Sequence, residues 1–464
     1  MEHGPHIMEQ FLNKNFVLCS MLQAHCSMLK SALKIVEALN AAGHIAYFAG
    51  GAVRDQLLDR KVADVDIATS AKPVEIEKLF PKTHPLGKEF GVMLVILNKH
   101  AFEVATFRGE SNYDGRRPGK VFFTNAEEDA KRRDFTVNGL FYDPLEKKVL
   151  DFVNGQHDLK LKVIRFIGSP EERIQEDHLR LLRAVRFKNT LGFEFEPKTK
   201  EAIEANANLI KKISGERIRD ELNKMFEDEH RAQAVRDLEQ FGLLEILLPE
   251  LMRLKGLPQP TKYHREGDAF THSLGSLAAL PKNISLAVAW AALFHDLGKA
   301  DTLRHDPDRI RYPGHAEKSA EIADLILRRL KFDNATRAKI TWLIGHHMLF
   351  GDLPKMRPAR RHEYFMHPWF ADLIKVCAAD VGGTRPADYQ LQKKIVKMWK
   401  TETQEKLLPP PKELLTGVEI IEKLHVPVGP QVGRLKKILY DAQVEGLVQS
   451  REEAIKFLEK CLKR

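Results

Sequence analysis

The sequence predicts an α+β fold, in which a small mixed β-sheet with helices is followed by an all-helical remainder. Two observations support this division. Short apolar runs separated by turn residues, the pattern of strands, are confined to the part of the chain before about residue 165. From Pro170 onward, apolar residues recur mainly at helical spacing.

Length and composition limit the possible functions. A chain of 464 residues with 43% hydrophobic residues can bury a large core and should form about two to four domains. Its formal charge of +9 and pI near 9.1 suggest a polyanionic partner, of which nucleic acid is the obvious class. The four cysteines are scattered without metal-knuckle spacing, which favours the reducing cytoplasm. No apolar run is long enough to span a membrane.

Composition changes divide the chain into five segments. We expect a leader at 1–27, a head at 28–165, a helical neck at 166–255, a second helical domain at 256–405 and a helical tail at 410–464. Pro258 and Pro260 indicate the linker after the neck, and the prolines after Lys406 indicate the linker before the tail. The leader segment lacks the basic region and long apolar core of a signal peptide, which favours a first helix of the fold or a leader ahead of an internal start at Met28.

The first elements of the head predict a phosphate-binding turn. After a helix at 28–43, a short apolar strand containing Tyr47 and Phe48 ends at Gly50 and Gly51, and a helical run follows directly. Adjacent glycines let backbone N–H groups approach an anion, and a helix N-terminus favours negative charge. Such a turn is also common without a ligand.

Asp64 and Asp66 follow, with one apolar residue between them. Residues two apart on a strand share a face, so both carboxylates should project together. They repel each other unless a cation lies between them, and Mg²⁺ takes such oxygen sites and completes its shell with substrate phosphates. A hairpin predicted from Val92–Leu97 and Ala101–Phe107 offers Glu103 as a third carboxylate or as a solvent-facing edge residue. A phosphate turn beside paired carboxylates fits nucleotidyl transfer.

Two charged segments follow this hairpin. The segment 108–120 is basic and rich in Gly, Asn, Asp and Pro, which predicts a mobile loop. Farther along lie Arg132, Arg133, Asp134 and Asn138. Arginines bind phosphate as planar forks, and Asp and Asn can hold ribose hydroxyls, although a lone Arg-Arg-Asp run is usually a solvated surface.

A helix is predicted from Arg173 to Phe187. Its charged residues at i, i+3, i+4 and i+7 share one face, and they are Glu176, Asp177, Arg180 and Arg183. A salt-bridged helix surface would produce the same pattern. A further helix with the sequence GERIRDEL is predicted to begin after Ser214, since serine is a preferred N-cap residue.

Together these motifs resemble the class II tRNA nucleotidyltransferases (CCA-adding enzymes) and the bacterial poly(A) polymerases. The patterns are G-G-x-V-R-D, D-x-D-[IL]-[AT]-T, R-R-D-F-T-x-N and E-D-x-x-R. The resemblance implies a nucleotidyltransferase head in which Asp64 and Asp66 are catalytic and hold Mg²⁺ for two-metal phosphoryl transfer. It extends over nearly the full length from about residue 30.

The resemblance also implies a nucleotide site. Gly50, Gly51 and Arg54 would cradle the triphosphate. The remaining implied residues fix the ribose or read the base, and they are Arg133, Asp134, Asn138, Asp177, Arg180 and Arg183. In this family the Asp and Arg of E-D-x-x-R form a protein template that selects C and A by their exocyclic amines. The GERIRDEL helix would brace that template.

A flexible loop is a further feature of the family. Its D-G-R-x-P context is matched by Asp114, Gly115, Arg116 and Pro118. The resemblance implies that this loop helps to reorganise the site for the last adenosine. CC-only enzymes lack it, so its presence argues against that subtype.

A second set of possible metal ligands lies downstream: His272, His295, Asp296, His315, His346, His347 and Asp380. Imidazole suits Zn, Ni, Mn or Fe, and carboxylates bridge such ions. Any one of these residues alone is more often an ordinary polar residue. The ordered set resembles HD-domain phosphohydrolases and implies a divalent transition metal that places an activated hydroxide against a phosphate ester. Lys299 would contact the substrate phosphate.

These resemblances imply a tRNA nucleotidyltransferase that adds C and/or A to tRNA 3′ ends from CTP and ATP. The HD domain would be a 2′,3′-cyclic phosphodiesterase, 2′-nucleotidase or phosphatase on RNA ends, or a scaffold that has lost activity. Arg434, Lys436 and Lys437 in the tail would track an RNA backbone or form a solvated helix face. An A-adding enzyme, a poly(A) polymerase and a catalytically dead RNA-binding scaffold remain alternatives. No membrane partner is expected, and the oligomeric state is not indicated.

Overall fold

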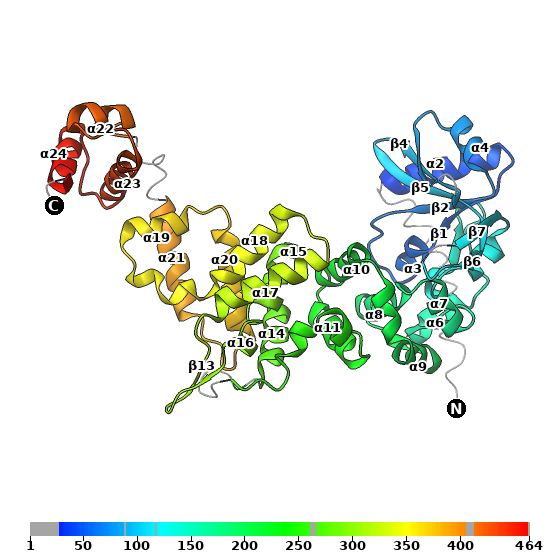
Figure 1. Ribbon diagram of the computed structural model, residues 1–464. Coiled ribbons are helices and arrows are strands. Elements are labelled where there is room, and N and C mark those ends of the chain that lie inside the picture. Colours follow the sequence, from blue (N-terminus) through cyan, green and yellow to red (C-terminus); the bar gives the residue numbers. More distant parts are fainter. Residues whose placement is uncertain are drawn as a thin grey trace. The chain divides into compact units, whose positions relative to one another are not determined.

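The computed structural model describes residues 27–87, 90–116, 118–259, 265, 267–404 and 413–462. The leader predicted at 1–27 lies outside these residues except for Ser27. The chain divides into two compact units (Figure 1). The first contains the chain up to Met225 together with Arg236–Leu247, and the second contains Phe226–Val235 together with Leu248–Arg464.

A seven-stranded mixed sheet forms the first part of the first unit, in the order β3-β4-β5-β2-β1-β8-β9. β2 and β5 are parallel, and the other neighbours are antiparallel. The strands are β1 Ala46–Ala49, β2 Asp66–Thr69, β3 Thr83–Gly87, β4 Val92–Leu97, β5 His100–Thr106, β8 Leu140–Asp143 and β9 Lys148–Asp151. The predicted α+β class with a mixed sheet is confirmed.

Short helices accompany this sheet: α2 Ser27–Ala41, α3 Gly51–Leu57, α4 Pro73–Leu79, α5 Ala126–Lys131, the 3₁₀ turn η2 Thr136–Asn138 and α6 Gly155–Leu161. The helix predicted at 28–43 is α2, and it is followed by Gly43 in the left-handed region (φ 84°). The hairpin predicted from β4 and β5 is also present, with Asn98 and Lys99 at its turn in left-handed conformations.

The mobile loop predicted at 108–120 is wrong. This segment lies largely in an antiparallel hairpin of β6 Arg108–Tyr113 and β7 Pro118–Phe123. Some of its polar side chains bind one another, because Glu110 accepts hydrogen bonds from Arg108 Nε and from the Tyr113 hydroxyl, both at 2.6 Å. The turn-forming residues that suggested a loop are concentrated at the tip, where Arg116 lies.

The single helix predicted from Arg173 to Phe187 is also wrong. The chain forms α7 Pro170–Glu176, leaves the helix at Asp177 (φ −147°, ψ 106°) and starts α8 Arg180–Leu191. The Asp177 carboxylate accepts the backbone N–H of Leu179 at 3.1 Å, a local bond that competes with helix formation. Asp177 therefore lies in the break between two helices and not on a continuous helix face.

The chain after the sheet is mostly helical, as predicted. The remaining helices of this region are α9 Pro197–Ala205, η3 Ala207–Lys212, α10 Gly215–Glu227, α11 Arg231–Gln240, α12 Leu244–Leu247 and α13 Pro249–Met252. β10 Val163–Ile164 and β11 Glu194–Phe195 form a two-stranded parallel ladder.

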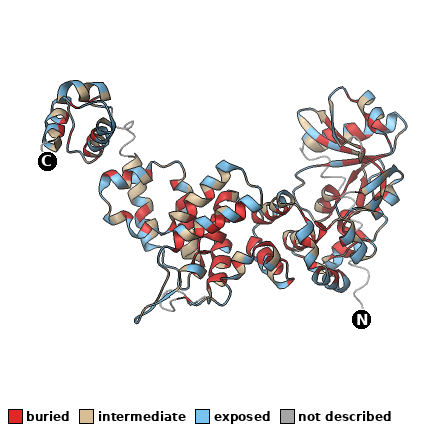
Figure 2. Ribbon diagram, in the orientation of Figure 1, coloured by how far each residue is buried: buried red, intermediate tan, exposed pale blue. Residues whose placement is uncertain are grey.

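Helices also build the larger part of the second unit (Figure 1). They are α14 Ala269–Ala278, α15 Leu286–Phe294, α16 Lys299–Thr302, α17 His315–Arg329, α18 Asn334–Gly345, η4 His347–Gly351, η5 Leu353–Lys355, α19 Pro358–Phe365, α20 Phe370–Gly383 and α21 Gln390–Gln404. A small hairpin joins β12 Arg304–His305 to β13 Ile310–Arg311. In α15 every residue from Ala287 to Phe294 is buried, so this helix lies at the centre of its domain (Figure 2). Among the described residues, no helix has the length and apolar character needed to cross a membrane.

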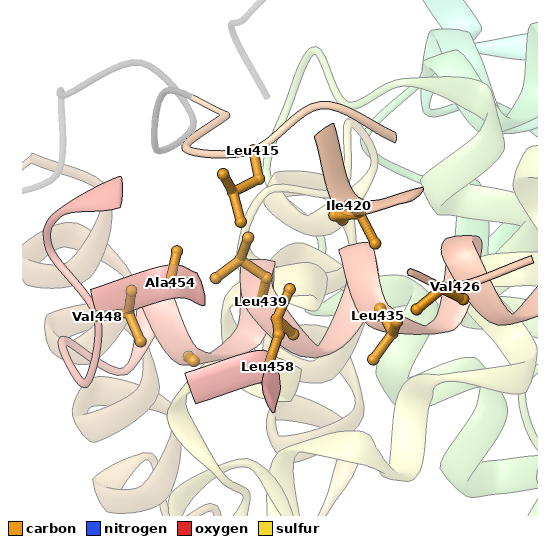
Figure 3. Close-up of a cluster of buried hydrophobic side chains, with 9 residues drawn as sticks. Leu415, Ile420, Val426, Leu435, Leu439, Val448, Ala454 and Leu458 are labelled. Atoms are coloured by element: carbon orange, nitrogen blue, oxygen red, sulfur yellow. The ribbon is translucent and has the colours of Figure 1, made fainter. Parts of the chain in front are cut away.

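The C-terminal helices are α22 Gly417–Leu424, α23 Pro430–Val444 and α24 Arg451–Leu462. Their apolar faces form a hydrophobic core of their own (Figure 3), made by Leu415, Ile420, Val426, Leu435, Leu439, Ala442, Val448, Ala454 and Leu458. Burial of side chains of this size is worth about 1.5–3 kcal/mol each against leaving them exposed. The segment thus has a core that needs no side chain from the preceding helices.

Candidate active sites

A pocket of about 750 Å³ lies in the first unit, beside the first residues of β2. It is lined by every residue predicted for nucleotide addition except Arg116, namely Gly50, Gly51, Arg54, Asp64, Asp66, Arg133, Asp134, Asn138, Asp177, Arg180 and Arg183. These residues come from segments that are more than 100 positions apart in the sequence. The pocket is therefore the candidate active site of this unit.

The glycine turn at the end of β1 lets the Arg133 guanidinium approach the backbone closely. Gly50 has φ 63°, a left-handed conformation that side chains other than glycine rarely adopt. A Cβ atom at Gly50 would lie 2.8 Å from Arg133 Nη1, which is too close. Glycine at this position thus permits both the turn and the approach of Arg133.

Asp64, Asp66 and Glu103 bring three carboxylates to one side of the pocket. Asp66 begins β2, and Glu103 lies on the parallel neighbour β5, where Ile67 pairs with Val104. Loss of water around the Asp66 carboxylate raises its pKa to about 6; Glu103 and Asp64 add to this rise and Arg133 opposes it. A carboxylate that resists ionisation among like charges is stabilised by a bound cation.

Asn138 links the residues from the R-R-D-F-T-x-N motif to the glycine turn. Its side-chain oxygen accepts a hydrogen bond from Arg54 Nη1 at 2.6 Å, and its amide donates to Asp134 at 3.0 Å. Asp134 in turn forms an ion pair with Arg183 Nη2 at 2.6 Å. Arg54, Asn138 and Asp134 are nearly buried, and the Arg183 side chain is 30% exposed. This chain of hydrogen bonds and ion pairs holds the two arginines in position at the pocket wall.

Asp129, which was not among the predicted site residues, is the buried counter-charge of two arginines that line the pocket. It is 1% exposed and forms ion pairs with Arg132 at 2.6 Å and Arg133 at 3.0 Å. Burial alone would raise the pKa of Asp129, but the two arginines outweigh that effect and hold the pKa below its usual 3.8. No motif marked this residue, because it belongs to an ordinary charged run, Glu-Glu-Asp, whose burial depends on tertiary packing.

Replacing Asp129 with asparagine is expected to destabilise this region by about 2 kcal/mol, because two arginines lose their buried counter-charge. The variant and the wild type should differ most in stability above about pH 4. This difference in stability should shrink as the pH falls through the lowered pKa of Asp129, because the wild type then also loses this charge. Amide hydrogen exchange in α5 and β6 measures the effect. Glu127→Gln, an exposed change on the same helix, should cost less than about 0.5 kcal/mol; equal effects of the two substitutions would contradict the assignment.

The residues predicted to read the base are braced by α10. Arg217 forms two parallel hydrogen bonds to the Asp177 carboxylate, at 3.0 and 2.8 Å. Arg180 Nη1 donates to Glu176 at 2.6 Å. Glu221, 2% exposed, forms an ion pair with Arg186 at 2.6 Å. The sequence predicted a bracing role for this helix but not the direct hydrogen bonds from Arg217 to Asp177.

The second unit contains two groups of side chains that could hold metal ions, and these are the groups of three or more ligands found among the described residues. One consists of His272, His295 and Asp380, and the other of Asp296, His315 and His347; in each, the ligand atoms lie within 4.8 Å of one another. Asp296 connects them, because its carboxylate lies 3.2 Å from His295 Nε2 and 3.5 Å from His315 Nε2.

The donor atoms of these histidines suit a metal. The Nδ1 atoms of His295, His315 and His347 lie 2.7–2.9 Å from backbone carbonyl oxygens, which leaves each Nε2 atom facing the group. His295 Nε2 is buried and, although the Asp296 carboxylate lies 3.2 Å away, it forms no hydrogen bond of good geometry. Burial lowers the pKa of His347 to about 3, with a further effect of His295 and His315, so His347 is neutral, as a ligand must be.

His346 is the one predicted ligand that the structure does not bring into either group. Its Nδ1 lies 2.8 Å from the Trp342 carbonyl oxygen, and its ring stacks on Trp342 with centroids 4.4 Å apart. Helix α18 ends at Gly345, His346 is its C-cap residue and His347 begins η4, so the two adjacent side chains point in different directions. Lys299 lies beside the groups, with Nζ 2.7 Å from Asp296 and donating to Gln259 at 2.7 Å.

Three family models match consecutive parts of the chain. The Poly A polymerase head domain matches residues 46–165, the probable RNA and SrmB-binding site of polymerase A matches 192–254, and the HD domain matches 270–397. The first of these ranges contains the glycine turn and all three carboxylates. The third contains all six residues of the two groups that could hold metal ions.

Curated relatives point to the same family. A CCA-adding enzyme of Bacillus subtilis is 42% identical over 269 residues, which is 58% of this chain and 64% of the relative. A CCA-adding enzyme of Lactobacillus helveticus is 50% identical over 205 residues, 44% of this chain and 51% of the relative. The chain thus spans less than two thirds of the length of these relatives.

Solved structures share the fold over a greater length. The CCA-adding enzyme of Bacillus stearothermophilus in complex with CTP is 27% identical, with a TM-score of 0.70, and the match covers 95% of this chain and 98% of that one. The Thermotoga maritima CCA-adding enzyme complexed with tRNA has a TM-score of 0.60 at 19% identity, covering 95% and 96%. The chain thus contains a poly(A) polymerase head domain, an RNA-binding segment and an HD domain in that order, and over nearly its whole length it shares the fold of solved CCA-adding enzymes.

Proposed function

We propose that this chain is a tRNA nucleotidyltransferase that adds C and A to tRNA 3′ ends from CTP and ATP. The observation that carries the proposal is the pocket in which paired carboxylates, a glycine turn, several arginines and the Asp177–Arg180 pair meet. The CTP and tRNA complexes of the similar solved enzymes support the same substrates. Cytoplasmic location is part of the proposal and is supported by the scattered cysteines.

In the proposed reaction the terminal 3′-hydroxyl of the tRNA attacks the α-phosphorus of the nucleotide and loses its proton, and pyrophosphate leaves. Asp64 and Asp66 would hold Mg²⁺, which fits a donor set of repelling carboxylates. When bound, such ions activate the attacking hydroxyl and neutralise the leaving pyrophosphate. Arg54 and Arg133 line the pocket beside the glycine turn and bind the triphosphate.

The ribose and the base are bound by other residues that line the same pocket. Asp134 and Asn138 present polar oxygens for ribose hydroxyls, and Arg183 fixes Asp134 through their 2.6 Å ion pair. Asp177 accepts from the exocyclic amine of C or A, while Arg180 donates to ring acceptors. Arg217 holds the Asp177 carboxylate at two points, so this acceptor is set before the nucleotide arrives.

For the second unit we propose hydrolysis of phosphate esters, in which water attacks phosphorus and the ribose hydroxyl leaves. The two groups of His and Asp residues would hold divalent transition metals such as Ni, Mn, Fe or Zn, which supply a hydroxide at neutral pH when bound. Lys299 is held beside Asp296 and would contact the phosphate. The substrate class proposed is a phosphate or cyclic phosphate at an RNA end.

Incubation of the purified chain with CTP, ATP and a tRNA that lacks its CCA end tests the main proposal. We expect successive addition of C, C and A, followed by arrest. Addition of A alone would favour an A-adding enzyme, and long A tails would favour a poly(A) polymerase. Absence of pyrophosphate release with either nucleotide would favour a dead RNA-binding scaffold and contradict the proposal.

A further inference from the structure

A pocket of about 460 Å³ adjoins the second metal-binding group, and the functions proposed above do not use it. His315, a member of that group, lines the pocket. His346, which follows the end of α18 and precedes the ligand His347, lines it as well. A ligand whose phosphate is held at the metal-binding group would therefore extend its remaining part into this pocket.

Aromatic rings form much of the pocket wall. Tyr312, His346 and Tyr364 line it, and the His346 and Tyr364 ring centroids are 5.9 Å apart. The His346 ring is fixed by its bond to the Trp342 carbonyl and by stacking on the Trp342 ring. Trp342 stacks in turn on His367, with centroids 3.9 Å apart and planes 5° from parallel. Such a supported ring offers a flat surface for a planar ligand.

The charge of the pocket excludes a second phosphate group. None of its lining residues, all within the described part of the chain, is a lysine or an arginine, whereas Glu317 and Asp352 both line it. Carboxylates repel phosphates but accept hydrogen bonds from amines. The pocket thus suits a flat, neutral group that carries N–H donors at its edge.

We propose that this pocket binds the base of the nucleotide whose phosphate is hydrolysed at the adjoining metal-binding group. The base stacks against the His346 ring, and Glu317 or Asp352 accepts a hydrogen bond from its exocyclic amine. Adenine and cytosine satisfy this requirement, and uracil, which has no exocyclic amine, does not. The inference rests on the proposed phosphohydrolase and adds to it a requirement for a base with an amine.

Substitution of His346 tests the stacking surface in the full-length chain loaded with Mn²⁺. His346→Ala should weaken binding of adenosine 2′-monophosphate by about tenfold or more, because stacking on one base is lost. His346→Phe keeps a flat ring and should bind within about threefold of the wild type. The matched control is His305→Ala on the exposed β12–β13 hairpin, which should have no effect. Equal losses in the alanine and phenylalanine variants would overturn the proposal and indicate a metal ligand instead.

Substitution of Asp352 tests the amine requirement. The wild type should bind adenosine 2′-monophosphate more tightly than uridine 2′-monophosphate, and Asp352→Asn should reduce this preference at least about threefold, because the amide can also donate to uracil. Asp308→Asn, which removes an exposed carboxylate on the same domain, is the control. Equal binding of the two nucleotides by the wild type would overturn the proposal.

Calorimetric binding and hydrolysis are measured separately, so the two proposals can fail independently. Binding with the expected base preference but no hydrolysis of either nucleotide would retain the pocket assignment and reject the phosphohydrolase. Hydrolysis of both nucleotides at equal kcat/KM, with equal affinity, would retain the phosphohydrolase and reject the pocket assignment. The first unit is unchanged in all variants, so nucleotide bound there contributes equally to each measurement.

Discussion

Replacing Asp66 with alanine is expected to abolish nucleotide addition, lowering kcat/KM for CTP and ATP by at least about a thousandfold. Asp66 begins β2 and lines the pocket together with Glu103 and Asp64, whose negative charges repel its carboxylate. Removing it takes away a proposed metal-ligand oxygen and leaves the glycine turn and arginines in place. Hydrolysis of phosphate esters by the second unit should continue at the wild-type rate.

Extension of a tRNA that lacks its CCA end, followed on a sequencing gel under single-turnover conditions, measures this effect. Glu146→Ala is the matched control, because it removes an exposed carboxylate from the β8–β9 turn of the same sheet. It should extend the tRNA at the wild-type rate. If Asp66→Ala extends the tRNA within about tenfold of the wild type, the catalytic assignment is wrong and the metal site must lie elsewhere.

The sequence predicted those elements whose local pattern agrees with their environment. The β4–β5 hairpin has apolar strands around a polar turn, and α2 ends before Gly43. The two errors arise where polar side chains form hydrogen bonds within the protein. Glu110 accepts a hydrogen bond from Arg108 in the β6–β7 hairpin, a segment whose sequence resembles a solvated loop. The Asp177 carboxylate accepts the backbone N–H of Leu179, which takes the place of a helical hydrogen bond although the sequence has helical periodicity there. Such pairing depends on contacts that periodicity does not contain.

The motif residues of the head line one pocket, as the sequence predicts, but the sequence did not identify the residues that hold their side chains in place. Asp129 and Glu221 lie in charged helical runs that read as solvent-exposed, yet each is nearly buried against arginines. Arg217 can bind the Asp177 carboxylate because Asp177 lies in the break between α7 and α8, which the sequence did not predict. For the second unit, residue type alone could not separate His346 from His347, because the end of α18 decides which ring faces the ligands.

Replacing Asp296 with asparagine is expected to lower phosphate-ester hydrolysis by at least about a thousandfold while leaving nucleotide addition unchanged. Asp296 is 1% exposed, and its carboxylate lies near residues of both metal-binding groups as well as 2.7 Å from Lys299 Nζ. The amide has the same shape but no charge. It therefore removes the anion between the two groups without opening a cavity.

Hydrolysis of adenosine 2′-monophosphate and addition of C and A to tRNA are measured on the same preparation, with added Mn²⁺, Ni²⁺ or Zn²⁺ to test whether excess metal restores the variant. Asp308→Asn is the control, since it removes an exposed carboxylate from the same domain. Because the asparagine leaves Lys299 without its buried partner, a fall in Tm is expected as well. Retained hydrolysis in Asp296→Asn would place the reaction outside these groups, and a parallel loss of both activities would mean that the substitution acts through folding. Only a selective loss supports two separate reactions in one chain, with addition and hydrolysis carried by different sets of carboxylates.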